Sequence, residues 1–311
     1  MTDDARHVWV VGGIAWDTVL HVQQYPARGG YVRGYRRVER PGGSAGNVAQ
    51  SLATAGLSVG FATTLGNDEF GRRLHAALQA GQLNDLHVSW ADGDTEHVLV
   101  VVDDEGDRTI FGLSHRESGS GSLDGVPLRA GDIVVFVVWE EDFLDDLALA
   151  AAAGCTTIVG LRALFDPRVA HADVAFGSHA DVPDGTDPRR HLDRFDRVVM
   201  THGARGAIQH TREAEIHQAA LPATVVDTTG AGDAFLAGYV TLYAHGHTNG
   251  IAALLAGALW AAAAVEVDAS VPPSWRSVDG LEELLNHETH QTVPANPRRT
   301  PPKQAESWMT K

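Results

Sequence analysis

Cysteine and lysine are almost missing from this chain of 311 residues. Cys155 stands alone, so no internal disulfide can form, and no spacing of cysteine and histidine resembles a zinc site. Lys303 and Lys311 are the only lysines, and the formal net charge of −16 argues against a nucleic-acid partner. No apolar run approaches the ~18 residues of a membrane span, and the acidic start MTDDARH is unlike a signal peptide. We therefore expect a cytoplasmic protein with no membrane or nucleic-acid partner.

Short β-branched runs alternate with alanine- and leucine-rich stretches over most of the chain. This alternation predicts an α/β fold in which helices cover both faces of a mostly parallel central sheet. We expect strands near residues 8–11, 59–64, 133–138, 156–159, 174–176 and 198–201, and helices near residues 47–55, 69–80, 143–153, 231–245 and 250–265.

Two segments, at about residues 17–40 and 97–112, interrupt this alternation. The second segment reads as two strands around a turn at 104–107. Together the segments are predicted to form a small β-sheet that closes over a ligand as a lid or packs against a second copy of the chain. An edge hairpin that extends the main sheet is the alternative. Residues 1–286 then form a single α/β domain, and the proline-rich, polar residues 287–311 are predicted to be a disordered tail.

The most specific motif is DTTGAGDAF, which begins at Asp227 and leads into a predicted helix. Gly230, Ala231 and Gly232 keep the backbone free of bulky side chains, and the free N–H groups of the first helical turn point at a bound ligand. The motif therefore predicts an anion-binding site. Asp233 lies in that first turn, where a carboxylate suits a general base that accepts a hydroxyl proton during phosphoryl transfer. Simple helix capping is the alternative for a shorter G-x-G-D string.

A second motif, GGSAGNVA, starts at Gly42 and is followed by TTLGNDEFGRRL. Gly42 and Gly43 expose backbone against which hydroxyl groups can lie, and Asn47 offers the donor and the acceptor that a polyol requires. Asp17 follows the first strand, at the edge where open parallel sheets bind ligands. Neither a Walker motif nor the G-x-G-x-x-G of a dinucleotide fold is present, so an NAD-linked oxidoreductase is a remote alternative.

These two motifs, in this order and separation, resemble the signatures of the ribokinase-like (PfkB-type) carbohydrate kinases over roughly residues 7–270. The resemblance implies a ribokinase-like fold with a small β-sheet lid. It also implies that Asp233 is the base within the anion hole formed by residues 230–233, and that the sugar is bound by Asp17, Gly42, Gly43 and Asn47.

The same resemblance extends to the nucleotide and to metal ions. The turn THGARG is similar to the family's T-x-G-x-x-G turn near the ATP phosphates, which implies roles for Thr201, Gly203 and Gly206. Adenine would lie against the helix 250–265 and the loop near 267–272. By resemblance Asp227 and Thr229 help bind a monovalent cation such as K⁺.

One position departs from the family pattern. Many relatives carry an N-x-x-E motif that organises magnesium and phosphate through water, whereas this chain has Ser178 and Asp181 at that spacing. One carboxylate is kept, and the shorter Asp181 still permits outer-shell binding of Mg²⁺, which readily keeps its waters.

We therefore expect an ATP-dependent kinase that uses Mg²⁺ and phosphorylates a hydroxyl of a small sugar or sugar-like polyol, of the ribose, fructose or keto-deoxy sugar acid type. A homodimer through the lid is expected by resemblance. Arg162 and Arg168 could hold a phosphate or carboxylate of the substrate, but a solvated loop pair is favoured, so an unphosphorylated polyol is preferred.

Two alternatives remain open. The first is a nucleoside kinase of the same family, which would be favoured if Trp16, Tyr31 or Tyr35 stacked on a base from the lid. The second is a non-catalytic sugar-binding regulator with the same fold. Retention of both Asp233 and the glycine loop argues against a regulator, because binding alone needs no base.

Overall fold

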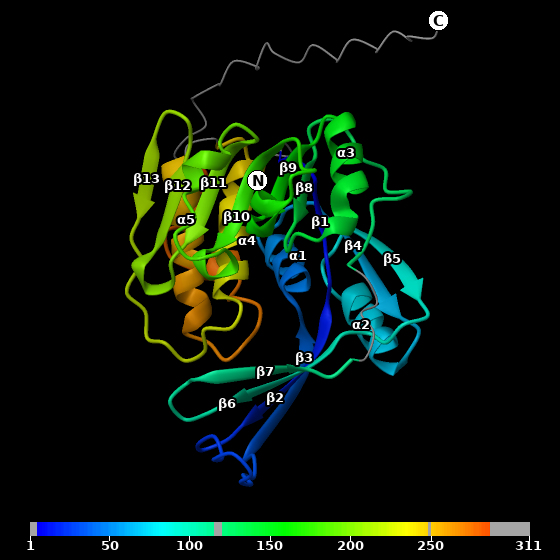
Figure 1. The fold of residues 1–311 in the computed structure, drawn as a ribbon, viewed down its shortest axis with the longest axis vertical. Coiled ribbons are helices and arrows are strands. Elements are labelled where there is room, and N and C mark those ends of the chain that lie inside the picture. The colour runs from blue at the N-terminus through cyan, green and yellow to red at the C-terminus, as the bar shows by residue number, and fades with distance from the viewer. Residues whose placement is uncertain (1–4, 115–119, 248–249, 287–311) are drawn as a thin grey trace, which may run out of the picture.

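The computed structural model describes residues 5–114, 120–247 and 250–286, and it separates a large main sheet from a small sheet (Figure 1). The tail predicted at 287–311 lies outside the described residues. The main sheet has the order β13-β12-β11-β10-β9-β8-β1-β4-β5. Its strands from β11 to β5 are parallel, and β12 and β13 add an antiparallel edge. The bounds are β1 Val8–Val11, β4 Val59–Gly66, β5 Asp85–Ala91, β8 Ile133–Phe136, β9 Thr156–Gly160, β10 Ala172–Ser178, β11 Phe195–Thr201, β12 Ala207–His210 and β13 Glu215–Gln218.

The side chains of β1 show that the main sheet is buried on both faces. Val8 and Val10 belong to one apolar core, while Trp9 and Val11 belong to a second, because successive side chains of a strand point to opposite faces. The predicted fold, with helices on both faces of a mostly parallel sheet, is confirmed. The first core includes side chains of α1 (Ser44–Thr54), α2 (Glu69–Ala80), α4 (Ala231–Ala244), α5 (Gly250–Val265) and α6 (Leu281–Asn286), and the second includes α3 (Leu144–Ala152).

The small sheet has the order β3-β2-β6-β7, and it projects away from the main body at one end of the molecule (Figure 1). Its strands are β2 (Ala15–His21), β3 (Arg36–Gly42), β6 (His97–Val102) and β7 (Arg108–Gly112). The predicted small β-sheet is therefore confirmed as a separate sheet, and the alternative of an edge hairpin on the main sheet is wrong.

Local signals explain where the helices begin. Helix α2 lies where it is predicted, because Asp68 caps it by accepting a hydrogen bond from the N–H of Gly71. Helix α1 instead begins at Ser44, before the predicted start at 47, because Gly43 with φ of 83° turns the chain into the helix there.

Strand β5 lies outside the predicted strands. Its side chains are only partly buried at the sheet edge, so it lacks the continuous apolar run that marks the central strands. Among the residues that the structure describes, no helix combines the length and the apolar character needed to cross a membrane.

Candidate active site

A cleft of about 1060 Å³ lies between the main body and the small sheet. The main body contributes the starts of α1 and α4 and the carboxyl ends of β10 and β11, which is the edge where open α/β sheets bind ligands. The small sheet contributes β2, β6 and β7. Gly42 and Asp227 are not part of the lining. Most of the predicted site residues do line the cleft, namely Asp17, Gly43, Asn47, Asp181, Thr201, Gly203, Gly206, Thr229, Gly230, Ala231, Gly232 and Asp233.

The start of α4 leaves backbone N–H groups free at the cleft. Gly230 turns the chain into the helix with φ of 77°, and a Cβ there would come within 2.4 Å of the carbonyl oxygen of Ser270. No side chain caps the helix, and the N–H groups of Gly232 and Asp233 have no acceptor among the described residues. A Cβ on Gly232 would meet no atom within 4 Å, so its absence leaves room for a ligand. This geometry fits the predicted anion hole.

Asp233 lies beside these N–H groups and is held by Asn47. The side-chain amide of Asn47 donates a hydrogen bond of 2.8 Å to Asp233 Oδ2. Burial raises the pKa of Asp233 to about 6, while hydrogen bonds from Asn47 and Ser44 and the charge of Arg108 oppose the rise. At neutral pH the carboxylate is therefore ionised and able to accept a proton.

Asp17 faces the cleft from β2 and is only 7% exposed. Burial raises its pKa to about 6; the charge of Arg40 opposes this shift and that of Asp233 adds to it. A Cβ on Gly42 would come within 2.0 Å of Asp17 Oδ2. Gly42 therefore makes room for this carboxylate, a role different from the predicted one of offering backbone to the ligand, whereas Gly43 does lie at the cleft.

The two raised pKa values predict opposite pH dependences for activity and stability. We expect kcat/KM to rise as the pH increases through about 6, because the base must be ionised. Both folded pKa values exceed the unfolded value of about 3.8, so the stability that these carboxyls contribute is complete below that value and is lost as the pH rises through about 6. Rate measurements and melting curves between pH 5 and 8 check this, with Asp17→Asn as the variant whose melting temperature should depend less on pH. A flat rate profile over that range would contradict the assignment.

The turn after β11 forms the other end of the cleft. Thr201, Gly203 and Gly206 line this end, and Thr201 Oγ1 donates a hydrogen bond of 3.4 Å to the carbonyl oxygen of Gly177. Part of the apolar wall lies on α5, where the sequence places adenine, so the wall fits a flat apolar ring. It is made by Ala220, Leu221, Pro222, Ala223, Val225, Phe235, Ala258, Ala261, Ala262 and Val265.

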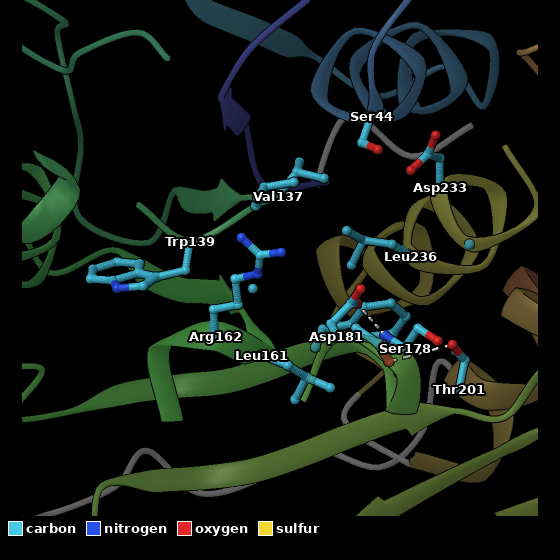
Figure 2. Close-up of a pocket in the computed structure, with 15 residues that line it drawn as sticks. Ser44, Val137, Trp139, Leu161, Arg162, Ser178, Asp181, Thr201, Asp233 and Leu236 are labelled. Atoms are coloured by element: carbon cyan, nitrogen blue, oxygen red, sulfur yellow. Dashed lines mark hydrogen bonds between the residues drawn. The ribbon is translucent and has the colours of Figure 1, made fainter. Parts of the chain in front are cut away.

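An annex of about 270 Å³ opens beside the cleft at the carboxyl ends of β8 to β11 (Figure 2). Asp181 borders both spaces, and its Oδ2 accepts a 2.8 Å hydrogen bond from the N–H of Ser178. Its Oδ1 could therefore contact a metal ion through water. Arg162 is exposed to solvent, as the favoured expectation has it, but it also lines the annex, and Figure 2 shows its guanidinium directed into it. Arg168 pairs with Asp166 and is absent from both linings.

The aromatic residues expected to stack on a nucleoside base lie elsewhere. Trp16 stacks on Phe70, with ring centroids 6.2 Å apart. The hydroxyl of Tyr35 donates a hydrogen bond of 2.9 Å to Asp104, and Tyr31 is 82% exposed. None of the three predicted residues lines the cleft as far as the structure describes it, so the feature that would favour a nucleoside is missing there.

Asp227 and Thr229 are each paired with an arginine from the small sheet. Arg108 Nη1 donates a hydrogen bond of 2.8 Å to Thr229 Oγ1, and Arg40 lies 3.7 Å from Asp227 Oδ2. The other oxygen of Asp227 accepts a hydrogen bond of 2.8 Å from the N–H of Thr229. The carboxylate of Asp227 and the hydroxyl of Thr229 are therefore already engaged, and a monovalent cation bound at Asp227 would have to share its carboxylate with Arg40 or displace that arginine. Sequence reasoning missed both arginines, because each contacts a residue far away in the chain.

Comparisons with known proteins agree with this geometry. The family model of the PfkB carbohydrate kinases matches residues 5–118 and 176–275. The chain is 28% identical over 285 residues to the ATP-dependent ribose-1-phosphate kinase of Halopiger xanaduensis, a match that covers 83% of this chain and 94% of that protein.

Two solved structures share the fold. The ribokinase of Arabidopsis thaliana, solved with ribose and ATP, matches with a TM-score of 0.70 and 21% identity, covering 90% of this chain and 98% of that chain. Phosphofructokinase-2 of Escherichia coli, solved with potassium, matches with a TM-score of 0.72 and 18% identity, covering 91% of this chain and 98% of that chain. The resemblance drawn from the two motifs is therefore confirmed, and the chain belongs to the PfkB family of carbohydrate kinases, which are ATP-dependent phosphotransferases.

Proposed function

We propose that this protein transfers the γ-phosphoryl group of ATP to a hydroxyl of a small sugar or sugar-like polyol. The observation that carries the proposal is the carboxylate of Asp233, which Asn47 holds at 2.8 Å beside the free N–H groups of α4. A carboxylate placed there can take the hydroxyl proton, and the N–H groups can stabilise charge on the transferred group. A sugar-binding regulator would need neither feature.

Each residue of the proposed site has a separate task. Asn47 keeps Asp233 turned toward the cleft, and Asp233 accepts the proton while the sugar oxygen bonds to the γ-phosphorus and the bond to ADP breaks. Asp17 and the backbone at Gly43 orient the other hydroxyl groups, and the turn after β11 holds the nucleotide phosphates. Asp181 would hold Mg²⁺ through water, and a bound Mg²⁺ neutralises charge on those phosphates.

A sugar that already carries a phosphate is the second candidate substrate. Arg108 lines the cleft from the small sheet, and Arg162 lines the annex. A guanidinium binds phosphate with two parallel hydrogen bonds. The relative from Halopiger xanaduensis is named for ribose 1-phosphate, which supports testing this substrate beside unphosphorylated sugars.

The small sheet would act both as a lid over the sugar and as a dimer interface. Val100 and Ile110 face the cleft, so Leu99 and Phe111, which are paired with each other, point to the opposite face of the sheet. Phe111 is 48% exposed there. Leu99 beside it is partly buried, and apolar side chains left at least partly exposed on one face of a sheet are typical of an interface between copies. The single, buried Cys155 supports a reducing compartment, so we place the protein in the cytoplasm.

The dimer predicts a change in mass on mutation. We expect the native protein to have twice the monomer mass by light scattering, and Phe111→Glu to have the monomer mass, because a carboxylate is costly to bury in an apolar interface. The control is Tyr31→Glu, which changes an exposed residue outside the strands and should remain dimeric. If the native protein has the monomer mass, the small sheet is not a dimer interface.

Release of ADP from ATP and Mg²⁺ tests the proposed function. The panel contains ribose, fructose, a keto-deoxy sugar acid, ribose 1-phosphate and two nucleosides. We expect ADP with at least one small sugar or sugar phosphate. Thermal stabilisation by a sugar without ADP release would indicate a binding protein, and ADP release with nucleosides alone would show a nucleoside kinase.

A further inference from the structure

Two segments pack against each other next to the anion hole: residues 226–230, and residues 265–270 from the last residue of α5 into the loop that follows. The N–H groups of Val226 and Asp227 donate hydrogen bonds of 2.7 and 3.2 Å to the carbonyl oxygen of Val265. Gly230 lies so close to Ser270 that a Cβ would come within 2.4 Å of its carbonyl oxygen. A displacement of either loop would therefore move the free N–H groups at the start of α4.

Arg40 lies between the acidic side chains of these two loops. Its guanidinium is 3.7 Å from Asp227 and 3.7 Å from Asp268, and its side chain is only 14% exposed. Without this charge the two carboxylates, themselves 13% and 24% exposed, would repel each other across the loop pair. Arg36 also pairs with Asp268, but it is 52% exposed and makes no ion pair with Asp227 among the described residues. Arg40 is therefore the cation that joins the loops.

Arg40 comes from the small sheet, while both of its acidic partners belong to the main body. It is on β3, directly opposite Asp17 of β2. The next residue, Pro41, accepts a hydrogen bond of 3.2 Å at its carbonyl oxygen from the hydroxyl of Ser270. Arg40, which pairs with the acidic side chains of both loops, thus lies on the same sheet as Asp17, the acid expected to bind the sugar.

We infer that Arg40 is a positioning residue that takes the place of the monovalent cation expected at Asp227, so that this kinase works without potassium. The inference rests on the proposed function. The E. coli phosphofructokinase-2 structure contains potassium, whereas here one oxygen of Asp227 accepts the N–H of Thr229 and the other faces Arg40. A guanidinium is a planar fork of donors that can serve two carboxylates at once. Because Arg40 is on β3 of the small sheet, closure of that sheet over the sugar would also align the anion hole.

The test replaces potassium chloride by tetramethylammonium chloride at constant ionic strength. For the native protein we expect kcat to change less than about 2-fold and the melting temperature to be equal in the two salts. For Arg40→Ala in tetramethylammonium we expect kcat to fall about 10²-fold, the size of effect produced by a ~1 Å misplacement. Potassium or guanidinium ions should restore kcat of this variant about tenfold and raise its melting temperature. The matched control, Arg36→Ala, removes the neighbouring arginine and should respond to salt as the native protein does.

Two outcomes would overturn the inference. One is saturable activation of the native protein by potassium of more than about tenfold. The other is a folded Arg40→Ala protein whose kcat and melting temperature respond to neither ion, since that would show a merely structural ion pair. The substitution Arg40→Ala could instead act by disturbing Asp17 on the neighbouring strand. The sugar KM would then rise and would not respond to cations, and this result would also count against the inference.

A second variant and the melting temperatures keep the inference testable if Arg40→Ala does not fold or if no activity is found. If Arg40→Ala does not fold, Arg40→Lys, which keeps a charge but loses the fork, should show a smaller loss of kcat and should still be rescued by guanidinium; a lack of rescue would count against the inference. The melting temperatures need no catalysis. If the protein never releases ADP but its melting temperatures follow the expected pattern in the two salts, the proposed function is wrong. The assignment of Arg40 as the cation at Asp227 would still be supported.

Discussion

Replacing Asp233 by asparagine is expected to lower kcat by about 10²- to 10⁴-fold, the range for loss of a general base. Asparagine has the same shape but cannot accept the hydroxyl proton, so the sugar KM should change less than about threefold. Asn47 can still contact the new side chain, and the N–H groups of Gly232 and residue 233 remain free to bind phosphate. Steady-state kinetics with the substrate identified from the panel, together with calorimetric sugar binding, measures both effects.

A matched control is available in another helix. Glu69 is also an acid in a first helical turn, at the start of α2, but it is 71% exposed. Glu69→Gln should therefore leave kcat unchanged. Near-normal turnover in Asp233→Asn would show that another group takes the proton. Because burial raises the pKa of Asp233 to about 6, the same substitution should also raise the melting temperature at pH 7, where the native carboxylate is charged at a cost in stability.

The second large effect is a loss of sugar affinity, which we expect for Gly42→Ala. The added methyl group would lie 2.0 Å from Asp17 Oδ2 in the present geometry, so the carboxylate must move. A displacement of ~1 Å in a positioned group can cost about 10²-fold, and we expect the sugar KM to rise by that order. Overpacking of this kind also costs about 1–3 kcal/mol of stability. Sugar titrations followed by calorimetry, with melting curves alongside, separate the two effects.

Gly13→Ala is the control for this substitution. A Cβ on Gly13 would meet no atom within 4 Å, and its backbone lies outside the positive-φ region. This variant should keep both the sugar affinity and the melting temperature of the native protein. Unchanged sugar binding in Gly42→Ala would mean that Asp17 does not contact the sugar.

The glycine-rich motifs lie where the sequence predicts them, and the structure shows what surrounds each glycine. Gly230 and Gly232 behave as the sequence predicts, one as a turn with positive φ and the other as an opening for a ligand. At Gly42 the structure adds a neighbour, the side chain of Asp17 from another strand, which the local sequence cannot reveal. The cation prediction at Asp227 likewise rested on the residue and not on its partners.

Local sequence alone determined the alternation of buried strands and helices, the two β segments that interrupt it, and the helix start that carries Asp233; that these segments form a separate sheet was decided by the structure. These features depend on the period of apolar residues and on turn-forming residues close together in the chain, so the sequence contains their signals. Only the tertiary structure decided which side chains face one another: Asn47 with Asp233, Arg108 with Thr229, and Arg40 with Asp227 and Asp268. Such contacts join positions far apart in the chain, where no spacing records the pairing. The packing of α1 against α4 creates the first contact, and the packing of the small sheet against the main body creates the others.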